Sequence, residues 1–193
     1  LPENGIDALP ETSYFIDYQG VRFIALNSNE KIDEQTVWLE KTLKNNPHEW
    51  AIAFLHHPIY SASTSRDNPE RRQAWKPLFD KYGVDLVLQG HDHSYARGSS
   101  SLIEENLSIG TNTKDATGTV YVVSVSGPKQ YEVKKDFKEY DISLDKSGQN
   151  KQLFQVISVE KNKLSYKSYT ATGDLFDSFE LIKNSDGINY LIN

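Results

Sequence analysis

The stretch VDLVLQGHDHSYARG, residues 84–98, places two histidines one residue apart, directly after a short apolar run. The segment AFLHHPIY, residues 53–60, repeats this arrangement, because the apolar run WAIAFL at 50–55 leads directly into His56 and His57. These two clusters contain four of the five histidines in the chain. Short apolar runs bounded by turn residues are typical of strands that are covered on both faces of a sheet. The sequence therefore predicts two buried strands that each end in histidine.

A helix is predicted before each of these two strands. Segment 33–46 has an amphipathic apolar stripe, and Asp33 is suited to cap its first turn. Segment 69–83 has proline in its first turn and ends at a glycine, which is the usual asymmetry of helix ends. Pro77 lies inside this second segment, so we expect the helix to bend or break there. The resulting order of strands and helices indicates a layered α/β core.

The two ends of the chain are predicted to be β-structure. Residues 13–19 and 21–28 are rich in aromatic and β-branched side chains around a Gln-Gly turn, which predicts a hairpin. Residues 119–127 predict one more core strand, and 153–182 alternate apolar and polar residues around two turns, as an antiparallel β-meander does. No linker or internal repeat interrupts this order, so a single α/β domain over residues 1–193 is expected.

Composition excludes several classes of protein. The 193 residues are 37% hydrophobic and 25% charged, which fits a folded globular chain. A net charge of −6 argues against binding to the nucleic-acid backbone. No apolar run approaches the roughly 20 residues of a membrane span. The first residues have neither a basic start nor an apolar stretch, so we expect no signal peptide in this chain. Disulfides and thiolate metal sites are excluded because cysteine is absent.

The placement of the histidines points to metal chemistry. In layered α/β proteins, ligands bind at the carboxyl ends of the core strands, where both clusters begin. His91 and His93 are at i and i+2, so both imidazoles can face one side while Asp92 faces the other. Neutral imidazole is the commonest metal ligand, and two ions about 3.5–4 Å apart can each take one of this pair. Adjacent His56 and His57 cannot easily face the same way, which suggests one ligand and one group beside it. A hydrogen-bonded polar turn is the alternative interpretation.

Other histidine-rich or catalytic patterns do not fit. The metallo-β-lactamase pattern H-x-H-x-D-H requires Asp-His at positions 95 and 96, which are Tyr95 and Ala96. Amidohydrolase barrels are much longer than this chain. The nucleophile elbow G-x-S-x-G, the P-loop and the dinucleotide fingerprint are all absent.

Three stretches together resemble the calcineurin-like metallophosphoesterases: LHHPIYSAS at 55–63, LFDKYGVDLVLQGHDHSYAR at 78–97 and YTATGDLFDSFELI at 169–182. Within that family the chain is similar to the purple-acid-phosphatase-like branch of extracellular or exported hydrolases. The resemblance implies half of a four-layer sandwich, with mixed β-sheets flanked by helices. It also implies a phosphatase or phosphodiesterase that cleaves phosphate esters with metal-activated hydroxide, and an extracellular or cell-surface location.

The resemblance assigns roles to particular residues. It implies that His56 and His91 bind one metal ion and that His93 binds a second, the ions being iron, zinc or manganese. By the same similarity, His57, Tyr60 and Arg97 are neighbours of the site. Arg66, with the serine before it, stands where plant purple acid phosphatases carry histidines, and a guanidinium is suited to bind an anion there. We therefore name His57, Arg66 and Arg97 as candidate catalytic residues.

Departures from the family pattern limit this expectation. The first three family motifs, D-x-H, G-D-x-x-Y and G-N-H-[DE], do not occur, and they supply the carboxylates of the site. We therefore expect the C-terminal part of a metallophosphoesterase domain that is inactive alone, binding one metal ion or none. Lost core strands would expose apolar surface, so an interface with the missing N-terminal half or with a second copy is expected. The rival hypothesis is a non-catalytic surface or interaction module that keeps the phosphoesterase fold.

Overall fold

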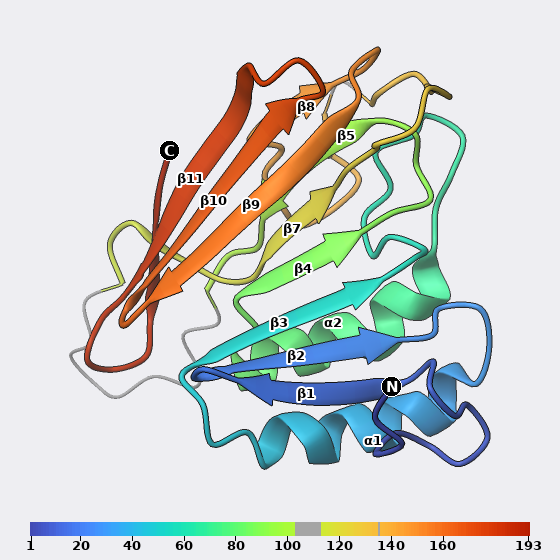
Figure 1. Ribbon diagram of the computed structural model, residues 1–193, viewed down its shortest axis with the longest axis vertical. Helices are drawn as coiled ribbons and strands as arrows, with labels where there is room; N and C mark the ends of the chain where they lie inside the picture. The colour runs from blue at the N-terminus through green and yellow to red at the C-terminus, as the bar shows by residue number, and fades with distance from the viewer. Residues whose placement is uncertain (103–112, 135) are drawn as a thin grey trace.

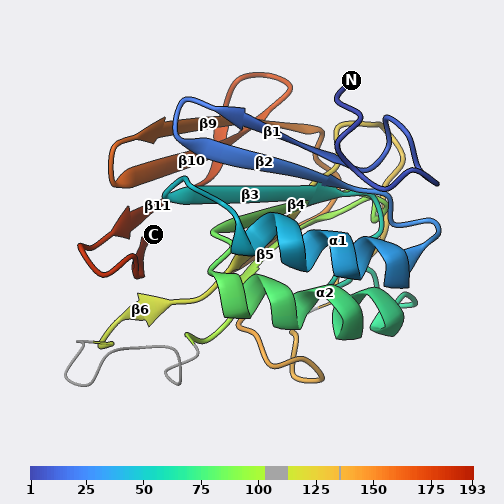
Figure 2. The same ribbon diagram turned by 90° about the horizontal axis from the view of Figure 1, so that it is seen from below.

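The protein is described by a computed structural model covering residues 1–102, 113–134 and 136–193 (Figure 1). Two β-sheets and two helices form three layers, in the order helices, seven-stranded sheet, five-stranded sheet (Figures 1 and 2). The expected α/β architecture with a C-terminal antiparallel meander is thus confirmed. Neither helix in the described part of the chain is long and apolar enough to cross a membrane.

The seven-stranded sheet has a parallel centre and antiparallel edges. Its parallel strands are β2 (Val21–Leu26), β3 (Trp50–Leu55), β4 (Leu86–Gln89) and β7 (Val120–Val123), and its antiparallel strands are β1 (Tyr14–Tyr18), β5 (Tyr95–Ser99) and β8 (Lys146–Gly148). The strand order is β1-β2-β3-β4-β7-β5-β8. Both apolar runs that precede the histidine clusters are therefore neighbouring parallel strands, β3 and β4.

Helices α1 (Ile32–Lys44) and α2 (Pro69–Tyr82) cover one face of this sheet side by side (Figure 2). Helix α1 begins at Ile32, so Asp33 lies in its first turn and does not cap it. Helix α2 runs through Pro77 without a break, so of the two expected outcomes the break is wrong and the bend stays a prediction. Trp75 and Phe79, on either side of the proline, are fully buried against the sheet. Burying two such side chains contributes more than the roughly 3 kcal/mol that an interior proline costs.

The five-stranded sheet is antiparallel and packs on the other face. It comprises β6 (Ala116–Thr117), β12 (Asn189–Ile192), β11 (Leu175–Lys183), β10 (Lys163–Thr170) and β9 (Leu153–Glu160), in that spatial order. The predicted meander is β9, β10 and β11, and the structure extends it by β12. Apolar side chains from both sheets fill the layer between them, including Ile52, Leu86, Leu164 and Leu181.

A buried ion pair also joins the two sheets. The Arg97 guanidinium on β5 donates from Nε and Nη2 to the Asp177 carboxylate on β11, at 2.8 and 3.2 Å. Tyr95 donates its hydroxyl to the same carboxylate at 2.7 Å, and Arg97 also reaches Asp145 at 3.3 Å. Arg97 and Asp177 are both buried. Burial raises the pKa of the Tyr95 hydroxyl, so this group stays a hydrogen-bond donor.

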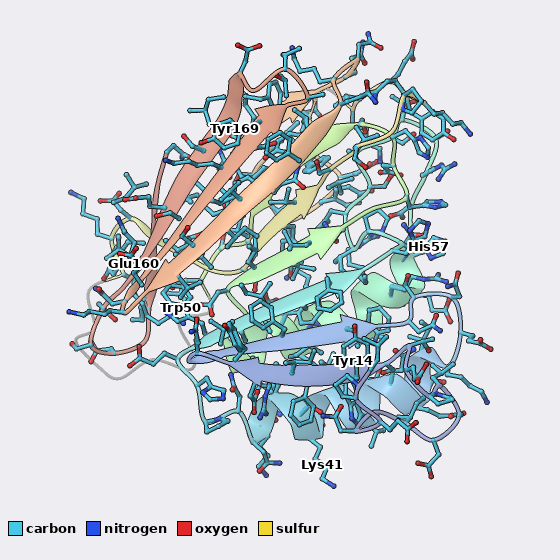
Figure 3. All side chains as sticks on the ribbon, in the orientation of Figure 1. Tyr14, Lys41, Trp50, His57, Glu160 and Tyr169 are labelled. Atoms are coloured by element: carbon cyan, nitrogen blue, oxygen red, sulfur yellow. The ribbon has the colours of Figure 1, made fainter. Side chains whose placement is uncertain are left out.

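The two sheets do not overlap completely. They meet where the Trp50 indole donates to the carbonyl of Lys161 at 2.8 Å. Away from this contact the two sheets diverge, so the five-stranded sheet does not cover the face of β1 to β3 that is turned toward the viewer in Figures 1 and 3. Five apolar side chains on these three strands are exposed or only half-buried and form what we call the open face: Tyr14, Ile16, Tyr18, Phe23 and Phe54. Tyr18 is 61% exposed. Strand β9 lies at the edge of its sheet, beside this face.

The inter-sheet ion pair yields a stability prediction. Asp177→Asn should destabilise the fold by about 3 kcal/mol, because it leaves the buried Arg97 charge with only Asp145 as an ionic partner. The midpoint of urea unfolding measures this loss. Glu180→Gln on the same strand is the matched control, since its ion pair with Lys163 is exposed and should contribute no more than about 1 kcal/mol. Equal midpoints for the two variants would contradict a role of Arg97 in joining the sheets.

Candidate metal centre

Parallel pairing of β3 with β4 brings the two histidine clusters together. Leu55, the last residue of β3, is in register with Gln89, the last residue of β4. One residue further on, the Gly90 amide donates to the carbonyl of His56 at 3.1 Å, which extends the pairing into the loops. His91 follows with a φ of 66°, a left-handed conformation that is uncommon outside glycine. Both clusters therefore emerge at one edge of the sheet, as the strand-end argument predicts.

Three imidazoles form a compact group at this edge. Nδ1 of His91 lies 3.0 Å from Nε2 of His56. The ring centroid of His57 is 4.9 Å from that of His56 and 4.4 Å from that of His91. One nitrogen from each ring lies within 4.8 Å of the others. We call His56, His57 and His91 the histidine cluster; the label in Figure 3 marks His57 where β3 ends.

The loop after β2 holds His57 in place. The buried Ser28 hydroxyl accepts a hydrogen bond from the His57 amide at 2.8 Å and lies 3.1 Å from its Nδ1. The Ser28 carbonyl in turn accepts from Nε of Arg71 on α2 at 2.7 Å. One side of the His57 ring is therefore occupied by the serine, and its Nε2 is the nitrogen that remains for other partners.

Asp92 faces away from the cluster, as expected from its place between His91 and His93. Its buried carboxylate accepts from the Ser61 hydroxyl at 2.7 Å and from the amides of Ala62 and Ser63 at 2.6 and 3.1 Å. These three bonds fix the start of the loop that leads to the other candidate residues after β3. Asp92 therefore holds the loop after β3 in place through hydrogen bonds on the side away from the histidine cluster.

His93 lies outside the histidine cluster. Its Nδ1 is 3.0 Å from the Lys129 carbonyl, and its own carbonyl accepts from the Tyr131 amide at 2.8 Å. The rings of His93 and Tyr131 are 4.8 Å apart, and the Arg66 guanidinium stacks over the same tyrosine at 5.0 Å. The 129–131 loop thus joins His93 to Arg66. Binding of a metal ion by His93 stays a prediction.

The three candidate catalytic residues are in different environments. His57 is a member of the histidine cluster. Arg66 is close enough for its charge to act on His57 and His91. Arg97 is elsewhere, buried between the sheets in its ion pair with Asp177, and this contact accounts for its position. A role for any of the three in catalysis stays a prediction.

The surroundings disfavour protonation of two rings of the cluster, His57 and His91. Burial lowers the pKa of His91 to about 4, and the charges of Arg66, His57 and His56 act in the same direction. Burial and the nearby Arg71 charge also lower the pKa of His57. Metal ions bind deprotonated imidazole, so these rings are ready to bind near neutral pH without releasing a proton.

The donor set fits one transition-metal ion but not two. Three imidazole nitrogens match the ligands that zinc and related ions take in open sites. No carboxylate joins this group in the part of the chain that the structure describes. A pair of ions 3.5–4 Å apart needs further ligands to bridge and neutralise it.

Sequence reasoning missed three contributors to the site. Ser28 is the last residue of the expected second strand of the hairpin, and the observed β2 ends two residues before it, so the strand-end argument that found the histidines also applies to it. Lys129 and Tyr131 lie in a loop more than thirty residues from either histidine motif, and no local pattern connects them with the site. They reach it because β7, which precedes the loop, pairs with β4.

The lowered pKa of His91 predicts a pH dependence of stability. Between pH 6.5 and about 4, an unfolded imidazole takes up a proton while folded His91 does not, so acid favours the unfolded state in this window. As the pH is lowered from 6.5 to about 4, urea midpoints should therefore fall more steeply for the natural chain than for His91→Asn, in which asparagine accommodates the left-handed backbone. Identical pH slopes would contradict the neutral state of the half-buried His91.

Known proteins share sequence and fold with this chain. The family profile described as calcineurin-like phosphoesterase matches residues 2–95. Purple acid phosphatase 15 of Arabidopsis thaliana is 31% identical over 59% of this chain, and an uncharacterized Mycobacterium tuberculosis protein is 37% identical over 33% of it. The chain spans only 21% and 13% of these relatives.

Solved structures show the same fold. The purple acid phosphatase PPD1 of yellow lupin superposes with a TM-score of 0.71 at 22% identity, over 91% of this chain and 33% of its own. Plasmodium GAP50, described as the anchor in the inner membrane complex, superposes with a TM-score of 0.62 at 18% identity, over 90% of this chain and 55% of its own. The profile match and these relatives agree: the chain belongs to the calcineurin-like metallophosphoesterases and has purple acid phosphatases among its homologues.

Proposed function

We propose that this chain carries the histidine side of a dinuclear metal centre that hydrolyses phosphate esters. The histidine cluster at the carboxyl ends of β3 and β4 carries this proposal. His56 and His91 would hold one ion and His93 the second, each being iron, zinc or manganese. When bound, the ions would lower the pKa of a water molecule and neutralise charge on phosphoryl oxygens.

The chain's own residues suit recognition of a phosphoryl group. Arg66 and Arg71 place positive charge beside the cluster, as their effects on the His57 pKa show. Held by Ser28 on its Nδ1 side, His57 can present Nε2 to a phosphoryl oxygen. Arg66 can donate two parallel hydrogen bonds to an oxyanion, the geometry that guanidinium groups favour. Orientation of the substrate is therefore the contribution we assign to these two side chains.

The centre needs carboxylates from a complementary segment. The family motifs that supply them are absent from this sequence, and the histidine cluster contains none. The open face and the edge of β9 offer apolar surface and strand pairing to such a segment, at the side of the fold where β1 to β3 are uncovered. We propose that the 193 residues are the C-terminal part of a metallophosphoesterase domain and are inactive alone. A second copy of the chain is the alternative occupant of the open face.

A non-catalytic interaction module is the second candidate. Among the residues that the structure describes, no carboxylate joins the histidine cluster, which favours this candidate, as does the fold it shares with GAP50, a protein described as an anchor. In that case the phosphoesterase fold would serve as a binding surface, and the histidines would stay without metal.

Activity measurements separate these candidates. The full reading frame that encodes these residues should hydrolyse p-nitrophenyl phosphate or its bis-ester with zinc, manganese or iron, and the isolated 193 residues should not. His91→Ala should lower turnover of the active protein by more than about a hundredfold, which exceeds the usual effect of losing an outer partner of a metal ligand. His48→Ala is the control, because His48 lies beside Asp17, away from the cluster. Unchanged turnover in His91→Ala would overturn the metal assignment, and absence of hydrolysis in every sample would favour the interaction module.

A further inference from the structure

The loop after β7 is held against His93 at the edge of the sheet. Nδ1 of His93 lies 3.0 Å from the Lys129 carbonyl, and the Tyr131 amide donates to the His93 carbonyl at 2.8 Å. Between these two loop residues, the Gln130 side chain forms hydrogen bonds with the backbone of residues 150 and 151, at 3.0 and 3.2 Å. The backbone of Lys129 and Tyr131 therefore has a fixed position beside the candidate metal centre.

Tyr131 brings two positive charges together. The Arg66 guanidinium lies 5.0 Å from the centroid of the tyrosine ring, and Nζ of Lys129 lies 5.1 Å from the same centroid. Nη2 of Arg66 also reaches the Tyr131 hydroxyl at 3.5 Å. Cations are attracted to the face of an aromatic ring. The tyrosine thus holds a guanidinium and an ammonium group at one ring, although like charges repel each other.

Neither cation has an acidic partner. Over residues 1–102, 113–134 and 136–193, no carboxylate lies within ion-pair distance of Arg66 or Lys129, and the buried Nη1 of Arg66 has no hydrogen-bond partner. Leaving a buried charged donor without an acceptor is costly. The other four arginines of the chain each have a carboxylate within ion-pair distance: Arg22, Arg71, Arg72 and Arg97. Arg66 and Lys129 are therefore a pair of cations suited to an anionic ligand.

The two cations differ in their relation to the histidine cluster. Arg66 is close enough for its charge to act on His57 and His91, and we assign it to the phosphoryl group. Lys129 is exposed. A phosphate ester that directs its phosphoryl group to the cluster directs its alcohol portion toward solvent. The Lys129 ammonium group is therefore placed to meet the alcohol portion of the substrate.

We infer that Lys129 selects phosphate esters whose alcohol portion carries a second anionic group, either a carboxylate or a further phosphate. The inference rests on the proposed function and names the class of substrate for that site. A neutral alcohol offers the ammonium group no partner, whereas an anionic one supplies the charge that the described residues do not. Tyr131 is a positioning residue in this arrangement, because it keeps both cations at one ring.

Paired substrates test this selection on the protein encoded by the full reading frame. Two pairs differ by an anionic group: glycerol 3-phosphate with 3-phosphoglycerate, and fructose 6-phosphate with fructose 1,6-bisphosphate. In at least one pair, the ester with the second anionic group should have a kcat/KM higher by about fivefold, the effect of a solvent-accessible charge pair. Lys129→Gln should remove this ratio by raising KM for that ester. Lys41→Gln, in the last turn of α1 and away from His57 (Figure 3), is the matched control and should keep the ratio.

Binding of phosphonates gives a second readout that needs no turnover. In calorimetry of the same protein, 3-phosphonopropionate or 1,3-propanediphosphonate should bind about fivefold more tightly than propylphosphonate, which lacks the second anionic group. Lys129→Gln should remove this difference. Circular dichroism should show the variant folded, because the Lys129 side chain is exposed.

The outcomes separate the selection from the proposed function. Preferences that Lys129→Gln leaves unchanged in both assays would overturn the role of Lys129, while hydrolysis of all four esters would leave the phosphoesterase function intact. Absence of hydrolysis together with a Lys129-dependent phosphonate preference would overturn the proposed function and support the anion site. Equal loss of the preference in Lys129→Gln and Lys41→Gln would indicate general electrostatic attraction and would overturn the assignment. A Lys129-dependent preference for only one kind of second group would support the inference and identify that group as carboxylate or phosphate.

Discussion

Parallel pairing of β3 with β4 is the constraint on which the rest of the site depends. The two strands end in register, and the bond from the Gly90 amide to the His56 carbonyl continues their pairing past the last strand residues. Histidines separated by 35 residues in the sequence thereby come within hydrogen-bonding distance. The crossover through α2 makes this arrangement possible, because parallel neighbours require a long connection and α2 packs it against one face of the sheet.

The electrostatics of the edge follow from the same arrangement. Burial and neighbouring guanidinium groups disfavour protonation of His57 and His91, so the imidazoles present lone pairs near neutral pH. The same positive surroundings favour an anion, whether a carboxylate ligand or a phosphoryl group. The same group of residues can therefore bind a metal ion and an anion. Because the histidine cluster contains no carboxylate, carboxylate ligands for a metal ion would have to come from outside the cluster.

Much of this arrangement is predictable from local sequence. The apolar run at 50–55 is β3, and the histidines after it emerge at the edge where parallel strands end. The resemblance to the family rests on those same residues. Strand β5 escaped prediction because Tyr95–Ser99 has no apolar alternation. Its arginine is buried by Asp177, a partner 80 residues away, and no sequence window contains both. Burial of the side chains around Pro77 keeps helix α2 continuous although proline is a local helix breaker. Strand pairing brings Ser28 and Tyr131 to the site.

X-ray absorption at the zinc edge tests the central claim most directly, because it reports the atoms around the metal. With one equivalent of zinc bound to the natural chain, the account predicts imidazole scattering from His56 and its cluster partners at zinc–nitrogen distances of about 2.0–2.1 Å. His56→Ala should remove one imidazole from the shell. A first shell of water oxygens without imidazole scattering would contradict a metal centre at the ends of β3 and β4.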